Sequence, residues 1–158
     1  MSAMQALAEQ TGFSLLEVLV TLIVLSLGIL GLAGLQSAAL KNGHSALLRA
    51  QAAQYAYDMA DRMRANRQQA VSTALPYNMG LSSTPPTGAG LPTSDRAGWI
   101  RQLQSLPEGA GAIAVTPAGN VTITVRWDET ALGNTATDPT CPEPRLAGRV
   151  CFVLDTRI

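Results

Sequence analysis

The longest apolar stretch of the chain covers residues 13–35, and Glu17 is its only charged residue. A helix needs about 20 apolar residues to cross the hydrocarbon core of a bilayer. The pattern therefore predicts a membrane-spanning helix near the start of the sequence. An ionisable side chain inside such a span costs free energy and usually marks a functional position. Glu17 is accordingly the first candidate functional residue.

After the span, apolar residues recur every three or four positions, which is typical of one face of a helix. Asp58 and Arg62, and likewise Asp61 and Arg64, are spaced to pair along the exposed side of that helix. Basic residues up to Arg67 suit a helix C-terminus. We expect the helix to continue to about this point and to pack an apolar stripe on the rest of the protein. The stripe consists of Leu48, Ala52, Tyr55, Met59 and Met63.

The middle of the chain, residues 72–93, is rich in Ser, Thr, Pro and Gly, which predicts a loop. A linker between two domains is the alternative, but the chain is too short for two good cores. Asp95 is expected to cap a short helix that ends before Pro107 and Gly109. The apolar face of this helix consists of Trp99, Ile100 and Leu103, with Leu106 beyond them.

The last third of the chain alternates between apolar and polar residues, as a strand with one buried face does. The clearest segment covers residues 121–127. A preceding strand contains Ile113 and Val115, and a final strand contains Val150, Phe152 and Leu154. One long helix followed by about three antiparallel strands predicts an α+β fold, with the apolar stripe of the helix against the sheet.

The length and net charge of the chain limit the classes of function to be considered. The chain has 158 residues, which is enough for about one domain. Its formal net charge is zero, with 11 basic and 11 acidic residues. Nucleic-acid-binding proteins usually carry a basic excess, so we predict no direct nucleic-acid partner.

The sequence does not predict an enzyme. His44 is the only histidine, and a catalytic triad needs a base and a nucleophile in one pocket. Asp58 and Asp61 could imitate a catalytic pair of carboxylates, but salt bridges to nearby arginines explain their presence. Two cysteines with His44 far away lack the number and spacing of metal ligands. We expect no catalytic residue, no metal and no cofactor.

The N-terminal segment does not look like an ordinary secretory signal. Residues 1–12 contain no Lys or Arg, and Glu9 is their only charged residue, whereas a signal begins with a basic region. A plain signal anchor is the alternative, but an anchor gains nothing from Glu17. The run GFSLLEV at residues 12–18 resembles the processing site of type IV prepilins and of the related type II secretion pseudopilins.

This resemblance implies that a membrane aspartyl peptidase, the prepilin peptidase, cuts between Gly12 and Phe13 and methylates the new α-amino group of Phe13. Glu17 then becomes the fifth mature residue. The implied organisation is a leader peptide (1–12), a transmembrane and assembly helix (13–35) and a pilin-like periplasmic globular domain (36–158). In a filament of apolar helices, Glu17 is expected to pair with the α-amino group of a neighbouring subunit, which offsets its burial and fixes axial register.

A second resemblance is carried by the extended helix. The DMADRMRAN run within residues 49–67 resembles the corresponding stretch of PilV-type minor pilins. It implies a minor pilin that acts with other minor pilins, the major pilin and the inner-membrane assembly machinery to promote pilus assembly, twitching motility and adhesion. The implied location is the inner membrane, in contact with lipid, and later the pilus. By charge alone, Lys41 and Arg49 beyond the span favour the opposite orientation in the membrane, with the residues after the span in the cytoplasm. The resemblance outweighs this count of basic residues.

The two cysteines, Cys141 and Cys151, flank a segment that contains Pro and Gly. In an oxidising compartment we expect them to pair and to close a loop that contributes roughly 2–3 kcal/mol. This arrangement resembles that of pilins, which have a disulfide-bounded loop near the C-terminus. Two buried thiols are the alternative.

Two alternative functions stay open, and so do two interpretations of the glycines in the span. A minor pseudopilin of a type II secretion system shares the N-terminal motif, and a membrane-anchored periplasmic enzyme is a candidate of another class. Within the span, Gly28, Gly31 and Gly34 allow either local melting during assembly or close approach between helices.

Overall fold

The computed structural model describes residues 14–158. The chain divides into two units, one up to Leu40 and one from Lys41 onward. The helices are α1 (Leu15–Ala65), α2 (Arg67–Ala70), α3 (Leu91–Leu103) and the 3-10 helix η1 (Thr130–Leu132), and the strands are β1 (Met79–Ser82), β2 (Ala110–Val115), β3 (Asn120–Asp128) and β4 (Arg149–Arg157).

In its described part, the first unit consists of Ser14 and the apolar N-terminal part of α1, up to Leu40. Between residues 14 and 40 every side chain is exposed. By length and composition, α1 contains a stretch that is able to cross a membrane. The hydroxyl of Thr21 donates to the carbonyl oxygen of Val18 at 2.8 Å, and the hydroxyl of Ser26 donates to that of Leu22 at 2.6 Å. Because these hydroxyls are satisfied inside the helix, they add little cost in an apolar medium.

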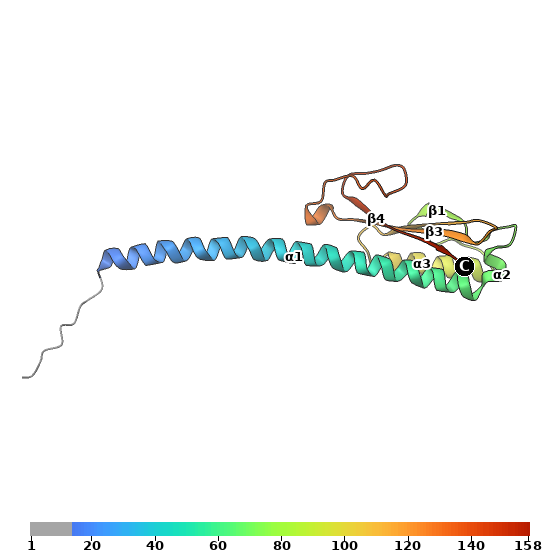
Figure 1. The fold of residues 1–158 in the computed structure, drawn as a ribbon, viewed down its shortest axis with the longest axis horizontal. Helices are drawn as coiled ribbons and strands as arrows, with labels where there is room; N and C mark the ends of the chain where they lie inside the picture. The colour runs from blue at the N-terminus through green and yellow to red at the C-terminus, as the bar shows by residue number, and fades with distance from the viewer. Residues whose placement is uncertain (1–13) are drawn as a thin grey trace, which may run out of the picture. The chain divides into compact units, whose positions relative to one another are not determined.

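The second unit is a four-stranded antiparallel sheet in the order β1-β2-β3-β4, with helices on one face. Figure 1 shows the C-terminal part of α1 and α3 on the same side of this sheet. The period-two pattern of β3 divides its side chains between the two faces: Val121, Ile123, Val125 and Trp127 enter the core, whereas Thr122 and Arg126 lie on the opposite face. The predicted α+β fold, a long helix packed on a small antiparallel sheet, is confirmed.

The predicted helical stripe is confirmed as well. Leu48, Ala52, Met59 and Met63 are buried in the core, and Tyr55 is partly buried against it. The two predicted ion pairs are present: Asp58 to Arg62 at 2.8 Å and Asp61 to Arg64 at 2.7 Å.

The core combines residues of α1, α3 and the sheet. Trp99 is fully buried, and its indole Nε1 donates to the carbonyl oxygen of Tyr55 on α1 at 2.9 Å. Below the ring lies Gly111 of β2, where a Cβ atom would overlap both Trp99 and Leu103. Glycine is required there because α3 approaches the strand too closely for any side chain.

Two sequence-based expectations were wrong in detail. The expected loop over residues 72–93 contains β1, which pairs with β2 with an irregular register. The short helix begins at Leu91, not after a cap at Asp95. Pro92 in its first turn explains the earlier start. Backbone N–H groups in the first turn of a helix have no partner within the helix, so proline, which has no N–H, fits there without losing a hydrogen bond. Asp95 lies inside the helix and accepts a hydrogen bond from the hydroxyl of the fully buried Tyr77, at 2.6 Å.

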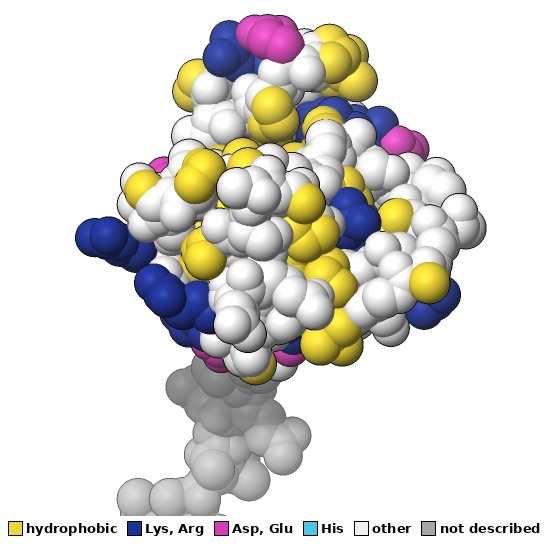
Figure 2. Space-filling view, turned by 90° about the vertical axis from the view of Figure 1, so that its right-hand side faces the viewer, with side chains coloured by type: hydrophobic (Ala, Val, Ile, Leu, Met, Phe, Trp, Pro, Cys, Tyr) yellow, Lys and Arg dark blue, Asp and Glu magenta, His cyan; other side chains and the backbone are white. Residues whose placement is uncertain are grey.

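One face of the globular unit is shown in Figure 2. Among the described residues on that face, basic side chains lie in separate small groups, and hydrophobic side chains are scattered between polar ones. That face therefore presents no continuous basic surface.

Candidate functional site

The N-terminal motif is only partly within the structure, because Gly12 and Phe13 lie outside the described residues. Ser14 directly precedes α1, and its side-chain oxygen accepts a hydrogen bond from the backbone N–H of Leu16 at 3.3 Å. Glu17 follows in the first turn, where a carboxylate interacts favourably with the positive end of the helix dipole. Within residues 14–158 the exposed carboxylate of Glu17 has no side-chain partner.

The glycines of the span pack against no side chain of residues 14–158. At Gly28, Gly31 and Gly34 an added Cβ atom would meet no atom within 4 Å. Their cost in helix stability, about 1 kcal/mol each, therefore has no compensating contact within the described residues. Local melting and close packing with another helix both remain as interpretations.

The C-terminal loop is closed by a disulfide between Cys141 and Cys151, as the sequence favoured. Asp138 ties the same loop to β4: its carboxylate accepts hydrogen bonds from the backbone N–H of Cys151 at 3.0 Å and from the hydroxyl of Thr140 at 2.6 Å. Burial acts to raise the pKa of Asp138, but these hydrogen bonds outweigh it and the pKa is lowered. The disulfide and these hydrogen bonds together hold the loop against β4, an edge strand of the sheet.

A buried carboxylate, Glu129, was not anticipated from the sequence. It is only 3% exposed and accepts hydrogen bonds from Trp127 Nε1 at 2.9 Å and Ser45 Oγ at 3.0 Å. Asn134 in the C-terminal loop donates to its other oxygen at 3.4 Å. Glu129 therefore joins α1, the end of β3 and the loop. The sequence contains no signal for this role, because an acidic residue after a strand usually faces solvent.

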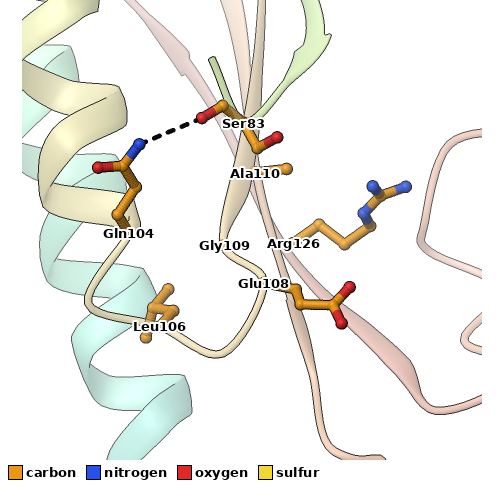
Figure 3. A pocket seen from close by; sticks show the side chains of 7 residues that line it. All are labelled: Ser83, Gln104, Leu106, Glu108, Gly109, Ala110 and Arg126. Atoms are coloured by element: carbon orange, nitrogen blue, oxygen red, sulfur yellow. Dashed lines mark hydrogen bonds between the residues drawn. The ribbon is translucent and has the colours of Figure 1, made fainter. Parts of the chain in front are cut away.

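The globular unit also has a surface depression of about 370 Å³ beside β3. Figure 3 shows Gln104 and Leu106 on one side and Arg126 and Glu108 on the other. The Gln104 side chain donates to the carbonyl oxygen of Ser83 at 3.4 Å. Within residues 14–158, no group of three or more His, Cys, Asp or Glu side chains is placed to hold a metal ion.

The comparisons with known proteins concern the N-terminal motif. Neither the curated proteins nor the solved structures that were compared with the chain gave a match. A family model described as "Prokaryotic N-terminal methylation motif" matches residues 7–33. The match includes Gly12, Phe13 and Glu17, the residues on which the predicted processing site rests. The chain therefore carries a prokaryotic N-terminal methylation motif, like that of type IV pilins and pseudopilins.

Proposed function

We propose that this protein is a minor pilin of a type IV pilus, of the PilV type, which prepilin peptidase cuts after Gly12 and methylates at Phe13. The observation that carries the proposal is the match of residues 7–33 to the methylation motif. The globular unit supports it, because a helix-on-sheet body with a C-terminal disulfide loop follows the apolar helix. The motif suggests a structural protein that is the substrate of an enzyme.

In this proposal Glu17 is a docking group. Its position in the first turn of an exposed apolar helix leaves the carboxylate without a partner inside the described chain. If that helix were buried among other subunits, the charge of Glu17 would be removed from water without a partner. The α-amino group created at Phe13 of a neighbour supplies the opposite charge. The pair then fixes the axial register between subunits and adds little net stability.

The proposed life cycle begins with insertion in the inner membrane as a single-pass protein with the globular unit in the periplasm. After processing, the chain joins other minor pilins and the major pilin at the assembly machinery. Its contribution is to promote pilus assembly, and through it twitching motility and adhesion.

Mass spectrometry of the protein from a strain with active prepilin peptidase tests the processing. We expect a mature chain that begins with methylated Phe13. A Gly12→Leu variant is the matched control, because a bulky side chain before the cut should leave the chain full-length and unmethylated. An uncut wild-type chain in a strain that processes its other prepilins would contradict the proposal.

A minor pseudopilin of a type II secretion system is the second candidate, since the same motif occurs in that class. Deletion of the gene separates the two. The pilus proposal predicts lost twitching with normal exoprotein secretion, whereas the pseudopilin candidate predicts the reverse. Complementation with the wild-type gene controls for effects on neighbouring genes.

A further inference from the structure

β4 forms one edge of the sheet, because the strand order is β1-β2-β3-β4. Along an antiparallel pair, residues that exchange backbone hydrogen bonds with the partner strand alternate with residues whose backbone groups point away from it. The N–H of Ile158 donates to the carbonyl oxygen of Gly119 at 2.9 Å, which continues the register that pairs Asn120 with Arg157. Even-numbered residues of β4 therefore bond to β3, and odd-numbered residues direct their backbone groups to the outer edge.

The beginning of this edge is covered by the C-terminal loop, residues 133–148. The N–H of Arg149 donates to the carbonyl oxygen of Leu146 at 3.2 Å, and the N–H of Cys151 donates to the carboxylate of Asp138 at 3.0 Å. Figure 1 shows this loop beside the beginning of β4, while the rest of the strand continues beyond it. The loop therefore occupies the edge only as far as Cys151.

From Val153 onward the edge is open. With the described part of the chain, the outward backbone groups of Val153, Asp155 and Arg157 form no hydrogen bond. Each of these residues offers one N–H donor and one C=O acceptor. β4 spans nine residues without a proline or a bulge, two of the devices by which proteins keep an edge from pairing. This half of β4 is therefore a template for a further strand.

The apolar side chains of β4 are also incompletely covered. Phe152 and Leu154 lie on the face that packs on the helices, but both are only partly buried. Their partners on β3 are fully buried. On the opposite face Asp155 and Arg157 are exposed. A fifth strand would cover apolar surface beside Phe152 and Leu154 and would place its own side chains opposite the two charges.

We propose that the edge from Val153 to Arg157 binds an extended segment of another pilin subunit, which joins the sheet as a fifth strand. The backbone selects a strand, because only an extended segment matches donors and acceptors that recur at every second residue. This segment presents apolar side chains next to Phe152 and Leu154, and an acidic side chain opposite Arg157. The pilin source of the segment rests on the proposed function, whereas the strand-binding edge does not.

A second copy of this chain fits the edge less well. Two β4 strands can pair antiparallel about a two-fold axis perpendicular to the sheet. Because α1 packs on the sheet, this symmetry points the two α1 helices in opposite directions, which chains anchored in one membrane by α1 cannot adopt. The other edge strand, β1, contains no charged residue to place opposite Arg157. The occupant is therefore a segment of a different subunit.

Amide hydrogen exchange, followed by NMR on the purified full chain in detergent, tests whether the edge is open. We expect fast exchange at Val153, Asp155 and Arg157, because their N–H groups have no acceptor. Exchange at Phe152 and Leu154 should be slow, since these residues bond to β3. Equal protection of the odd-numbered and even-numbered residues would show that the edge is already covered and would overturn the site.

Asp155→Pro tests strand addition in cells. Proline at this outward position removes the edge N–H and obstructs a fifth strand, but it keeps the hydrogen bonds to β3. Asp155→Ala is the matched control: it loses the same carboxylate, including the hydrogen bond from Thr122, and keeps the N–H. We expect incorporation into purified pili to fall about tenfold for Asp155→Pro and far less for Asp155→Ala. Equal incorporation of the two variants would overturn the site.

Thermal unfolding of each variant shows whether the globular unit is intact. If Asp155→Pro is destabilised, Val153→Pro and Val153→Ala repeat the comparison at the next outward residue. A photo-crosslinking residue in place of Arg157 tests the occupant, and it should join the chain to a different processed pilin. Crosslinks to a second copy of this chain would overturn the choice of a different subunit.

Processing at Phe13 separates this inference from the proposed function. Wild-type incorporation of Asp155→Pro, in an experiment where Glu17→Ala is poorly incorporated, would overturn the strand-binding edge and leave the pilin proposal standing. If the wild-type chain is not processed, the pilin proposal fails and the pilin source of the segment fails with it. Hydrogen exchange along β4 would still decide whether the edge is open.

Discussion

The indole Nε1 of Trp127 donates a hydrogen bond to the carboxylate of Glu129, with 2.9 Å between Nε1 and Oε1, and both side chains are buried. The hydroxyl of Ser45 on α1 donates to the same oxygen at 3.0 Å. A charged group out of contact with water is tolerated here because polar donors from separate parts of the chain surround it. This contact is one polar link between α1 and the end of β3.

Glu129→Ala is expected to lower the free energy of unfolding by about 1–3 kcal/mol, because it leaves the Trp127 N–H buried without an acceptor. Glu129→Gln should cost less, since an amide oxygen still accepts. Chemical denaturation of the full chain in detergent measures both. Glu143→Ala removes an exposed carboxylate paired with Arg145 and should change stability little. Equal losses for Glu129→Ala and Glu143→Ala would contradict this account.

Gly111→Ala is expected to destabilise the globular unit by about 1–3 kcal/mol, since the new methyl group overlaps Trp99 and the helix must shift. Gly80→Ala is the matched control in β1, where an added Cβ atom meets nothing within 4 Å. Thermal unfolding followed by tryptophan fluorescence reports on both variants. Similar midpoints for the two variants would show that α3 does not press on β2 as described.

Tyr77 should make the protein sensitive to alkaline pH. Burial, reinforced by its hydrogen bond to Asp95, raises the pKa of Tyr77 to about 12. A pKa that is higher in the folded state gives stability that is complete below the unfolded value of about 10 and is lost as pH rises toward 12. The loss amounts to roughly 3 kcal/mol. Unfolding measured from pH 9 to 12 should show this slope in the wild type and a smaller one in Tyr77→Phe. Tyr57→Phe, at an exposed position, should keep the wild-type slope.

The disulfide is expected to stabilise the C-terminal loop by about 2–3 kcal/mol, because it restricts the unfolded chain. The double variant Cys141→Ser/Cys151→Ser should have a lower unfolding midpoint than the wild type. A reducing agent should lower the midpoint of the wild type and leave that of the double variant unchanged. Proteolysis within residues 133–148 should become faster in the same variant. A wild-type midpoint that is insensitive to reduction would contradict the role assigned to the bond.

Glu17→Ala is expected to leave membrane insertion intact and to weaken recruitment into the filament. Removal of the charge makes the span more apolar, but it also removes the proposed partner of the Phe13 α-amino group. Membrane fractionation and immunodetection in sheared pili measure the two effects. Thr21→Ala, one turn further along the same helix, serves as the control. Wild-type incorporation of Glu17→Ala would rule out the docking role.

Sequence patterns were sufficient wherever the governing interaction is local. The apolar run from residue 13, the stripe that includes Leu48 and Met59, and the alternation from Val121 to Trp127 each follow from the geometry of one helix or strand. The N-terminal motif is local as well, so it was visible without any structure. These features determined the fold class and the family of motifs to which the start of the chain belongs.

The remaining features depend on residues that are far apart in the sequence. Ser45 and Glu129 are 84 positions apart, and the burial of this acid arises only when the sheet packs on α1. β1 lies in a Ser- and Gly-rich stretch with weak strand propensity, and it exists because β2 offers it an edge to pair with. Arg126 looks like an ordinary outward-facing residue of a strand. Only tertiary structure decides that its Nε atom is buried and, within residues 14–158, has no hydrogen-bond partner, because burial and pairing depend on which distant groups the fold brings together.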